Sequence, residues 1–364
     1  MHSNALTPLG RAMAIALLAT GSASAQASNN LAGGVWFNYV YETTDGADND
    51  NNGNFQDEAL VLYADGAAED GQGNWSYSAE LRVGPGSFTD TENNSTGDQI
   101  ALHKAWLGFD FADHHKLIIG KSQVPFGWKT SNFWPGDLLQ AGYGDQMDIG
   151  LKLTGDMGKV NYSAAYYHQD DWGTDSTDTV DDNGHWGSST TYRKVQTLVG
   201  DLNYPISEDH RIGVSLQSGK LQNLVANTDH DVEGSHQAGV LYYKGSFGKT
   251  FVNAEVMKTQ RELPDTYVDD AGIAEDEAET TRYAATLGRS SGNWTYYVDA
   301  SWAQTDTSGN DAGTVYAYAP GVKYNYGPGW IYAEYLDQSG YVGRNGDSHE
   351  SDFSALYLTI DFYF

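Results

Sequence analysis

The chain has 364 residues, of which 49 are Asp or Glu and 20 are Lys or Arg, so its formal net charge is -29. This excess of acid argues against nucleic-acid binding, because phosphates are bound by basic surfaces. Beyond the N-terminal segment there is no run of apolar residues long enough for a membrane-spanning helix, and the absence of Cys excludes disulfide bonds. The 42 Gly, 25 Tyr and 10 Trp favour strands and turns over helices.

The N-terminal segment has the pattern of a secretory signal peptide. Arg11 supplies a positive charge, Ala12–Ala19 is a short apolar stretch, and small residues follow it. Both Ala23–Ala25 and Ala25–Ala27 fit the A-x-A cleavage pattern. We therefore expect residues 1–25 to be removed on export, with cleavage after residue 27 as the alternative.

Apolar and polar residues then alternate in sixteen segments bounded by turn residues, which predicts strands. Most are longer than the roughly five or six residues usual in globular proteins and have about the length that a tilted membrane strand needs. The predicted strands cover residues 34–44, 57–66, 74–84, 99–112, 115–122, 145–154, 158–168, 192–203, 210–219, 234–246, 248–258, 279–290, 292–304, 312–326, 329–338 and 350–364.

The connections alternate between long and short. Long connections follow the first, third, fifth, seventh and eleventh strands, whereas short ones such as "GDMG", "SFG" and "YGPG" follow even-numbered strands. An up-and-down membrane barrel has short turns on one side and long loops on the other, whereas a soluble β-sandwich or β-solenoid gives no reason for this alternation. We predict that residues 26–364 form a single 16-stranded antiparallel transmembrane β-barrel in the outer membrane of a Gram-negative bacterium.

Charged residues keep to one face of the predicted strands. In "NWSYSAELRV", the aromatic and aliphatic residues share one parity, and Glu80 and Arg82 share the other. Because a Lys or Arg facing lipid at the midplane costs about 2–4 kcal/mol, we assign the charged parity to the pore. The parity of the fifth, eighth and fifteenth strands is ambiguous. The predicted pore-wall charges are Glu80, Arg82, Lys104, Asp148, Lys152, Arg211, Arg282, Asp299 and Lys323.

The chain ends on an alternating apolar segment, "SALYLTIDFYF". Its apolar parity predicts a lipid-facing stripe, with the intervening residues facing the lumen or the barrel rim. Since an unpaired strand edge is not tolerated in hydrocarbon, this last strand is expected to pair with the first. The lipid-facing residues are Leu358, Ile360, Phe362 and Phe364.

The connection at residues 121–144 differs from the other long ones because it is aromatic and carries little acid. Phe126, Trp128 and Trp134 are among its rings, and Asp137 is its acid. An aromatic loop needs a surface to pack against, and the barrel interior is the nearest one. We therefore expect this third external loop to fold inward and to narrow a channel that is otherwise wide.

Here the sequence resembles a known family. The segment "KLIIGKSQVPFGWKTSNF" (Lys116–Phe133), followed by "DQMDIGLKLTG", resembles a strand–GQ-x-x-x-PFG segment of the phosphate-selective O/P porin family. The resemblance covers about residues 30–364 at the level of pattern. It implies a trimeric channel for small hydrophilic solutes, in which Pro125, Phe126 and Gly127 begin the constriction loop with Lys121 and Lys129 beside it.

The same resemblance implies that Phe364 is a recognition signal for the barrel-insertion machinery. Phosphate selectivity in that family accompanies many Arg and Lys residues in the pore. This chain has 20 basic residues in all, so we expect a general channel rather than a phosphate-specific one.

One acidic stretch fits part of a calcium-binding template. Asp48, Asp50 and Asn52 occupy the first ligand positions of a calcium loop, but Ala59 stands where a bidentate Glu is required. An EF-hand is therefore excluded. A looser surface Ca²⁺ site at the three residues stays open, and no other cofactor is expected.

We predict a porin for passive diffusion of ions and small hydrophilic solutes, forming a homotrimer in contact with outer-membrane lipid and lipopolysaccharide. Its alternatives are a phosphate- or anion-selective porin, and a calcium-dependent surface or adhesion barrel with acidic loops. A lipase-like barrel enzyme is disfavoured, because the sequence has no G-x-S-x-G, H-E-x-x-H or phosphate-binding glycine motif.

Overall fold

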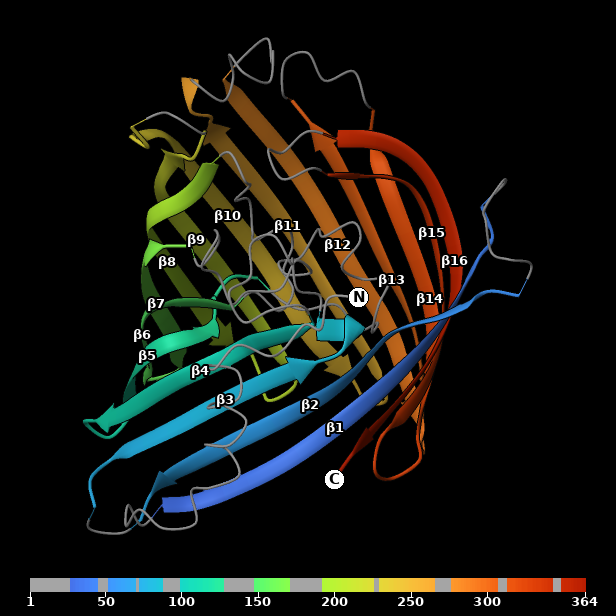
Figure 1. Cartoon of the computed structure of the whole chain (residues 1–364), viewed down its shortest axis with the longest axis horizontal. Helices are drawn as coiled ribbons and strands as arrows, with labels where there is room; N and C mark the ends of the chain where they lie inside the picture. The colour runs from blue at the N-terminus through green and yellow to red at the C-terminus, as the bar shows by residue number, and fades with distance from the viewer. Residues whose placement is uncertain are drawn as a thin grey trace, which may run out of the picture.

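The computed structural model describes residues 27–44, 52–69, 72–87, 99–127, 147–170, 192–225, 229–265, 276–306, 313–342 and 348–364. Sixteen antiparallel strands follow one another around a closed barrel, and the first pairs with the last (Figure 1). The predicted fold class is confirmed. Among the described residues, no helix is long and apolar enough to cross a membrane.

Each strand predicted from the alternation has its counterpart in the barrel. The first eight strands are β1 (Ala27–Glu42), β2 (Asn54–Ala68), β3 (Trp75–Val83), β4 (Ile100–Phe111), β5 (His115–Gln123), β6 (Met147–Met157), β7 (Val160–Gln169) and β8 (Tyr192–Pro205). The second eight are β9 (His210–Asn223), β10 (Val232–Phe247), β11 (Thr250–Glu262), β12 (Glu277–Ser291), β13 (Trp294–Thr305), β14 (Val315–Asn325), β15 (Trp330–Val342) and β16 (Ser348–Tyr363). A short 3-10 helix, Pro85–Ser87, follows β3.

Several strand ends differ from the prediction. β1 starts at Ala27 instead of residue 34, and β11 continues to Glu262 instead of 258. Residues 27–33 show no apolar alternation, yet Ala27 pairs with Ala68 of β2. The neighbouring strand therefore extends β1 by backbone pairing, which side-chain periodicity does not reveal.

Even-numbered strands lead into short turns, as predicted. The connections after β4, β6, β8, β10 and β12 span residues 112–114, 158–159, 206–209, 248–249 and 292–293. The strands alternate in direction, so these turns lie at one end of the barrel. The connections after β1, β3, β5, β7 and β11 contain residues outside the described part of the chain.

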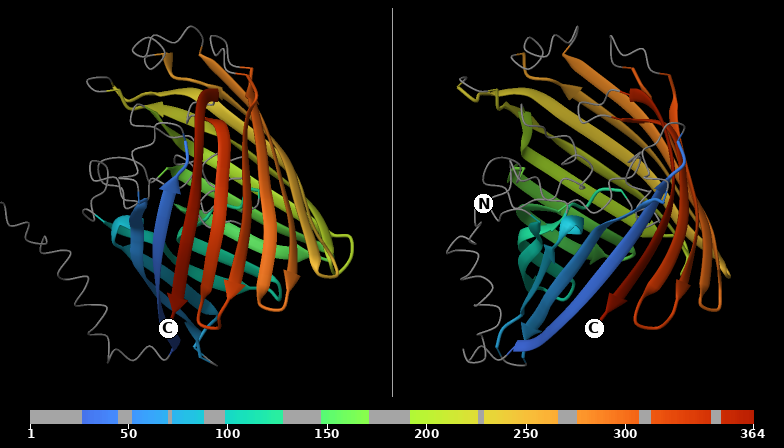
Figure 2. Two further views of the ribbon diagram at one scale, coloured as in Figure 1. Left: turned by 90° about the vertical axis from the view of Figure 1, so that its right-hand side faces the viewer. Right: turned by 45° about the vertical axis from the view of Figure 1, so that its right-hand side comes forward.

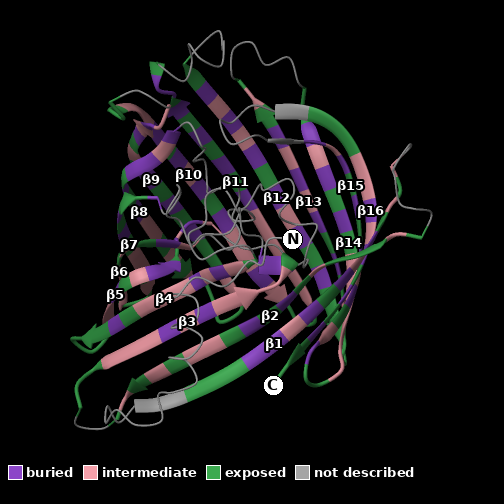
Figure 3. Cartoon of the chain, viewed as in Figure 1, coloured by how far each residue is buried: buried purple, intermediate pink, exposed green. Residues whose placement is uncertain are grey.

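The outer face of the barrel is apolar. Buried and exposed residues alternate along most strands (Figure 3), and exposed side chains include Leu216, Leu241 and Leu287, each about three-fifths exposed at 61%, 59% and 58%. A continuous apolar surface of this kind is a liability in water. It is what a barrel needs where its outer wall meets lipid.

The seam between β1 and β16 closes the barrel, and two views show these strands side by side (Figures 1 and 2). Gly33 N–H donates to Phe364 O at 2.8 Å, and Phe364 N–H donates back to Gly33 O at 2.9 Å. On the inner side, Thr359 Oγ1 donates to Asn38 Oδ1 at 3.0 Å. The predicted pairing of the terminal strand is confirmed.

Exposed and buried residues alternate along the C-terminal strand. Leu358, Ile360 and Phe362 are 40–43% exposed, whereas Thr359 and Asp361 between them are buried at 2% and 1%. Two of the ambiguous strands are resolved as well, because their buried inner residues include Thr197 and Val199 on β8 and Glu334 and Leu336 on β15. On β5, Ile118 is buried and Ile119 is exposed, but Lys121 and Ser122, which have opposite parity, are both buried.

The two faces should respond differently to a new charge. Leu151→Arg on the outer face of β6 should lower the free energy of unfolding by about 2–4 kcal/mol, because Leu151 is 48% exposed on the face assigned to lipid. Thr154→Arg, on the inner face of the same strand, should cost less than about 1 kcal/mol. Guanidinium titration of Trp fluorescence in lipid vesicles measures both. Equal losses for the two variants would contradict the assignment of faces.

Candidate functional site

The inner wall of the barrel is the candidate functional site. Side chains that alternate with the exposed apolar residues point inward, and many of them are charged. Burying a charge without compensation is costly, so each charged group on this wall raises the question of what stabilises it. The buried charged residues of the inner wall include Glu80, Asp148, Lys194, Glu255, Arg261, Arg282, Asp299, Glu334 and Asp361.

Two of the inner-wall cations lie over aromatic rings and beside acids. Arg82 Nε is 3.0 Å from Glu80 Oε1, and the guanidinium carbon of Arg82 lies 5.7 Å from the centre of the Trp36 ring. Lys323 Nζ lies 5.7 Å from the ring of Tyr297 and 5.8 Å from that of Tyr332. Cation–π contacts of this kind stabilise partly desolvated cations, so these two side chains are held against the wall.

Acidic side chains on the same part of the wall accept hydrogen bonds. Tyr297 O–H donates to Glu334 Oε1 at 2.5 Å, Trp330 N–H donates to Asp361 Oδ1 at 2.5 Å, and Thr286 Oγ1 donates to Asp299. Hydrogen bonds to an ionised acceptor stabilise more than those to a neutral one. The β12–β16 wall therefore holds its acidic side chains by hydrogen bonds from neutral donors of the wall itself.

The residues that follow β5 enter the barrel and pack on the inner wall of β7–β12. Val124 and Phe126 are 3% and 4% exposed and share an apolar cluster with Tyr167, Val199 and Met257 of β7, β8 and β11. This cluster fixes where the chain goes after β5.

A hydrogen bond anchors the same segment. Gly127 N–H donates to Ser215 Oγ of β9 at 3.1 Å. Ser215 Oγ in turn donates to Asp201 Oδ1 of β8 at 2.7 Å, and Tyr242 O–H of β10 donates to the same oxygen at 2.9 Å. Asp201 thus organises three neighbouring strands around the point that Gly127 reaches.

A group of basic side chains gathers on the inner wall of β8–β12, and we call it the basic cluster. It consists of Lys194, His236, Arg261 and Arg282, which are 1%, 1%, 4% and 6% exposed. His236 lies directly opposite Arg261 in the β10–β11 register. The charge of Lys194 interacts with those of Arg261 and Arg282 and, with opposite sign, with those of Asp148 and Asp170.

Gly219 of β9 makes the position of His236 possible. His236 Nε2 and Thr197 Oγ1 are 3.0 Å apart and bridge β10 and β8 over the intervening strand. A Cβ at residue 219 would lie 2.5 Å from His236 Nε2 and 2.7 Å from Thr197 Oγ1. Any larger residue there would displace the imidazole, so the glycine is part of the basic cluster's architecture.

The other sequence-predicted residues lie in separate parts of the wall. Lys104 is opposite Glu80 in the β3–β4 register, Lys152 Nζ donates to Gln123 O at 2.8 Å, and Arg211 lies near the short-turn end of β9. The structure therefore distributes the predicted pore charges around the barrel instead of joining them in one group.

Part of the predicted constriction loop can be placed. Lys121 lies within β5, opposite Ala105 and Ile149, so the prediction that the loop begins at this residue is corrected to a start after Gln123. Pro125, Phe126 and Gly127 follow the strand. Trp128, Lys129, Trp134 and Asp137 lie outside the described residues.

The candidate calcium residues are described only in part. Asp48 and Asp50 lie outside the described residues, and the backbone oxygen of Asn52 accepts a hydrogen bond from Tyr39 O–H at 2.6 Å. Within the described ranges, no three His, Asp or Glu side chains are grouped so that they could hold a metal ion.

Sequence reasoning missed three members of the basic cluster. The inward orientation of Lys194 could not be predicted from alternation, because the β8–β9 register shifts between Val195 and Leu198 and the alternation breaks there. Arg261 lies beyond the predicted end of its strand. A positive φ of 51° at Gln196 marks the irregularity, but nothing in the local sequence requires it.

No protein-family model and no curated protein sequence matches the chain. Solved structures do. The outer membrane channel DcaP of Acinetobacter baumannii is 13% identical, with a TM-score of 0.63 over 94% of this chain and 99% of that one. An anion-selective porin from Comamonas acidovorans is 12% identical, with a TM-score of 0.59 over 93% and 100%. In vitro folded OmpT of Vibrio cholerae, in a trimer form, is 12% identical, with a TM-score of 0.60 over 93% and 99%.

These likenesses establish the fold along nearly the whole chain. The barrel has the same fold as these outer-membrane channels and porins, and its apolar outer band agrees with the predicted location in that membrane. At such low identity, the likeness carries no information about solutes. The particular resemblance to the phosphate-selective O/P family is not tested by these matches.

The hydrogen bond between Tyr297 and Glu334 should contribute measurably to stability. Tyr297→Phe removes the donor and leaves a buried carboxylate less well solvated, which should lower the free energy of unfolding by about 1–3 kcal/mol. Tyr296→Phe is the matched control, because Tyr296 is 52% exposed on the outer face. Denaturant titration in vesicles compares the two, and equal effects would contradict the assigned role of Tyr297.

Proposed function

We propose that the chain forms a water-filled channel through the bacterial outer membrane for passive diffusion of ions and small hydrophilic solutes. The closed barrel with its charges on the inner face is the observation that carries this proposal. Sixteen strands enclose a lumen too wide for wall side chains alone to fill. A polar lining then favours water over lipid inside, and no chemical step is needed for transport.

We propose that residues 121–144, with the loop itself starting after Gln123, narrow this channel. Support comes from Val124, Phe126 and Gly127, which turn inward and contact β7–β12. A segment anchored to the inner wall at its first residues has to begin its course inside the barrel. The rest of the loop is expected to occupy cross-section that water would otherwise fill.

We also propose the partners and the processing that a barrel in the outer membrane would have. The apolar outer face of the barrel suits a homotrimer whose remaining outer surface contacts lipid and lipopolysaccharide. Phe364 would be recognised by the barrel-insertion machinery. Removal of residues 1–25 would leave β1 intact from Ala27, whereas cleavage after residue 27 would remove its first residue. A surface Ca²⁺ at Asp48, Asp50 and Asn52 stays a separate proposal.

A second candidate function is a channel with a weak preference for anions, and the basic cluster is the observation that favours it. Lys194, Arg261 and Arg282 lie on one section of the wall with Asp148 and Asp170 within electrostatic range of Lys194, while Asp299, Glu334 and Asp361 accept hydrogen bonds elsewhere. Charges act over about 8 Å at physiological ionic strength, so the excess of the three basic residues over Asp148 and Asp170 would act on its own section of the lumen. The distant acidic loops would lower the anion concentration at the entrance.

Deleting residues 128–143 should enlarge single-channel conductance in planar lipid bilayers, because the loop would no longer occupy the lumen. Removing an equal length from residues 171–191 is the matched control and should change conductance less. A conductance unchanged by the first deletion would contradict the proposed constriction. Absence of conducting steps from inserted wild-type protein would contradict the channel itself.

Ion preference can be measured separately from channel size. In a KCl gradient, the wild-type reversal potential should indicate that chloride passes more readily than potassium. Arg261→Gln with Arg282→Gln should shift that potential toward potassium, because both lost charges belong to the basic cluster. Arg289→Gln, at the short-turn end of β12, is the control. A potassium preference unaltered by the double substitution would contradict the second candidate.

A further inference from the structure

A hydrogen bond with an assigned direction holds the start of the connection after β5. Gly127 N–H donates to Ser215 Oγ at 3.1 Å, and Ser215 Oγ donates to Asp201 Oδ1 at 2.7 Å. A serine hydroxyl has one proton, so the bond to Asp201 leaves Ser215 Oγ as an acceptor toward Gly127. The carboxylate on β8 therefore determines which way the Ser215 hydroxyl on β9 faces.

Other donors fix the orientation of the carboxylate itself. Tyr242 O–H donates to the same Asp201 oxygen at 2.9 Å, and Asn203 Nδ2 donates to Asp201 Oδ2 at 3.4 Å. An ionised carboxylate only accepts hydrogen bonds, and hydrogen bonds to an ionised acceptor are stronger than those between neutral groups. Asp201 is therefore held in one orientation, and the Ser215 hydroxyl with it.

Tyr242 reaches Asp201 because a glycine lies between them. Tyr242 of β10 is directly opposite Gly213 of β9, and Asp201 belongs to β8 on the other side of β9. A Cβ at residue 213 would overlap both Cζ and the hydroxyl oxygen of Tyr242. Any side chain at residue 213 would push the phenol away from the carboxylate.

The same arrangement recurs six residues further along β9. His236 of β10 lies directly opposite Gly219, and its Nε2 is 3.0 Å from Thr197 Oγ1 of β8. Side chains from β10 thus cross β9 over a glycine on either side of the stretch that carries Ser215 and Gln217. This stretch of β9 is tied to both neighbouring strands before and after the point where the connection is anchored.

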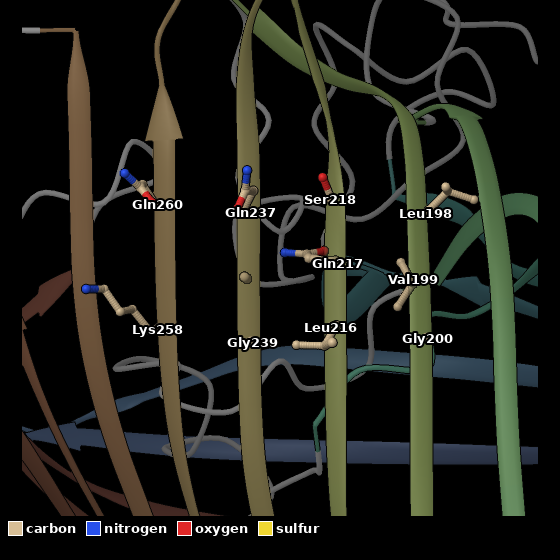
Figure 4. Close-up of a pocket in the computed structure, with 11 residues that line it drawn as sticks. Leu198, Val199, Gly200, Leu216, Gln217, Ser218, Gln237, Gly239, Lys258 and Gln260 are labelled. Carbon is tan, nitrogen blue, oxygen red and sulfur yellow. The ribbon is translucent and has the colours of Figure 1, made fainter.

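The apolar contacts of the connection are made at the same stretch. Val199 of β8 and Ala238 of β10 lie opposite Gln217 of β9 (Figure 4), and both share a buried cluster with Phe126. The ring of Phe126 and the amide of Gly127 therefore bind next to each other on one section of the inner wall.

The charges around Asp201 do not explain its place on the wall. Lys244 lies within electrostatic range of Asp201 and Glu255, and also of Arg211, which has the same sign as Lys244. The charges of these two acids and two bases cancel. The hydrogen bonds that Asp201 accepts therefore account for its position better than a role in selecting ions by charge.

We propose that Asp201 is a positioning residue of the channel. Through the Ser215 hydroxyl it holds the connection after β5 at Gly127, and so determines where the constriction begins. Without the carboxylate, this segment would exchange between an anchored and a released position. The effect on conductance rests on the proposed constriction, whereas the anchor itself does not depend on whether the lumen conducts.

Amide hydrogen exchange of the purified protein in detergent micelles, measured by mass spectrometry, tests the anchor. A peptide that covers residues 123–127 reports on Phe126 and Gly127, because Pro125 has no amide proton. Ser215→Ala removes the acceptor, and Asp201→Asn introduces a donor that can turn the Ser215 hydroxyl away. Since each change removes one hydrogen bond from the anchored position, each should raise exchange at Gly127 by roughly fivefold.

Matched variants separate positioning from a general loss of stability. Ser218→Ala removes an exposed hydroxyl from the same strand, and Asp209→Asn changes an exposed acid in the turn before it. Both should leave exchange at Gly127 as in the wild type. Gly213→Ala should act as Asp201→Asn does, because the added Cβ displaces Tyr242.

Planar-bilayer recordings on the same preparations measure the consequence for the channel. In Asp201→Asn and Ser215→Ala, visits to a larger conductance level should become roughly fivefold more frequent, because release of the same hydrogen bond governs both measurements. The two control variants should record as the wild type does.

Two results would overturn the proposal. Unchanged exchange at Gly127 in both Asp201→Asn and Ser215→Ala would show that these groups do not hold the segment. Exchange raised to the same extent throughout β8–β10 would show that Asp201 only stabilises the wall. Exchange raised at residues 126–127 alone, with conductance unaltered, would support the anchor and contradict the proposed constriction, so the two failures are distinguishable.

Discussion

Hydrocarbon offers no hydrogen-bond partner to a peptide group, so strands can cross a membrane only when every edge is paired. The seam between β1 and β16 meets that requirement, from Gly34 opposite Tyr363 to Glu42 opposite Ala355. The rest of the architecture depends on it. A closed wall has one face toward lipid and one toward a lumen, and period-two alternation then sorts every side chain between them.

That sorting explains where the charge lies and why it is tolerated. Acids and bases placed inside by their parity are stabilised by contacts with each other, with rings and with hydroxyl groups, as at Glu80 with Arg82 and at Tyr297 with Glu334. Phe126 and Gly127, which follow β5, also contact the inner wall of β7–β12. The basic cluster lies on this same wall, so the anchoring of the loop and the local field of the lumen are built on neighbouring strands.

Alternation and turn residues were enough to predict the strands, their number and the closing pair, because a membrane barrel imposes the same two-residue period on nearly every strand. The prediction was wrong where tertiary pairing overrides that period. Residues 27–33 join β1 through the backbone of β2, and the irregularity after Val195 hid the orientation of Lys194. The basic cluster could not be predicted as a group, because it joins side chains of β8, β10, β11 and β12, whose relative positions depend on the register of every strand pair between them. Similarly, the space that His236 occupies over Gly219 of β9 depends on how β8 and β10 lie on either side of β9.

The central claim is that the lumen is an open, passive path for small hydrophilic solutes. Swelling of liposomes that contain the purified barrel, in solutions of uncharged sugars of increasing size, tests it most directly. The account predicts swelling whose rate falls steadily as the sugar becomes larger, because diffusion through a narrowed aqueous channel discriminates by size. Swelling no faster than in protein-free liposomes, with the barrel shown to be inserted, would contradict it.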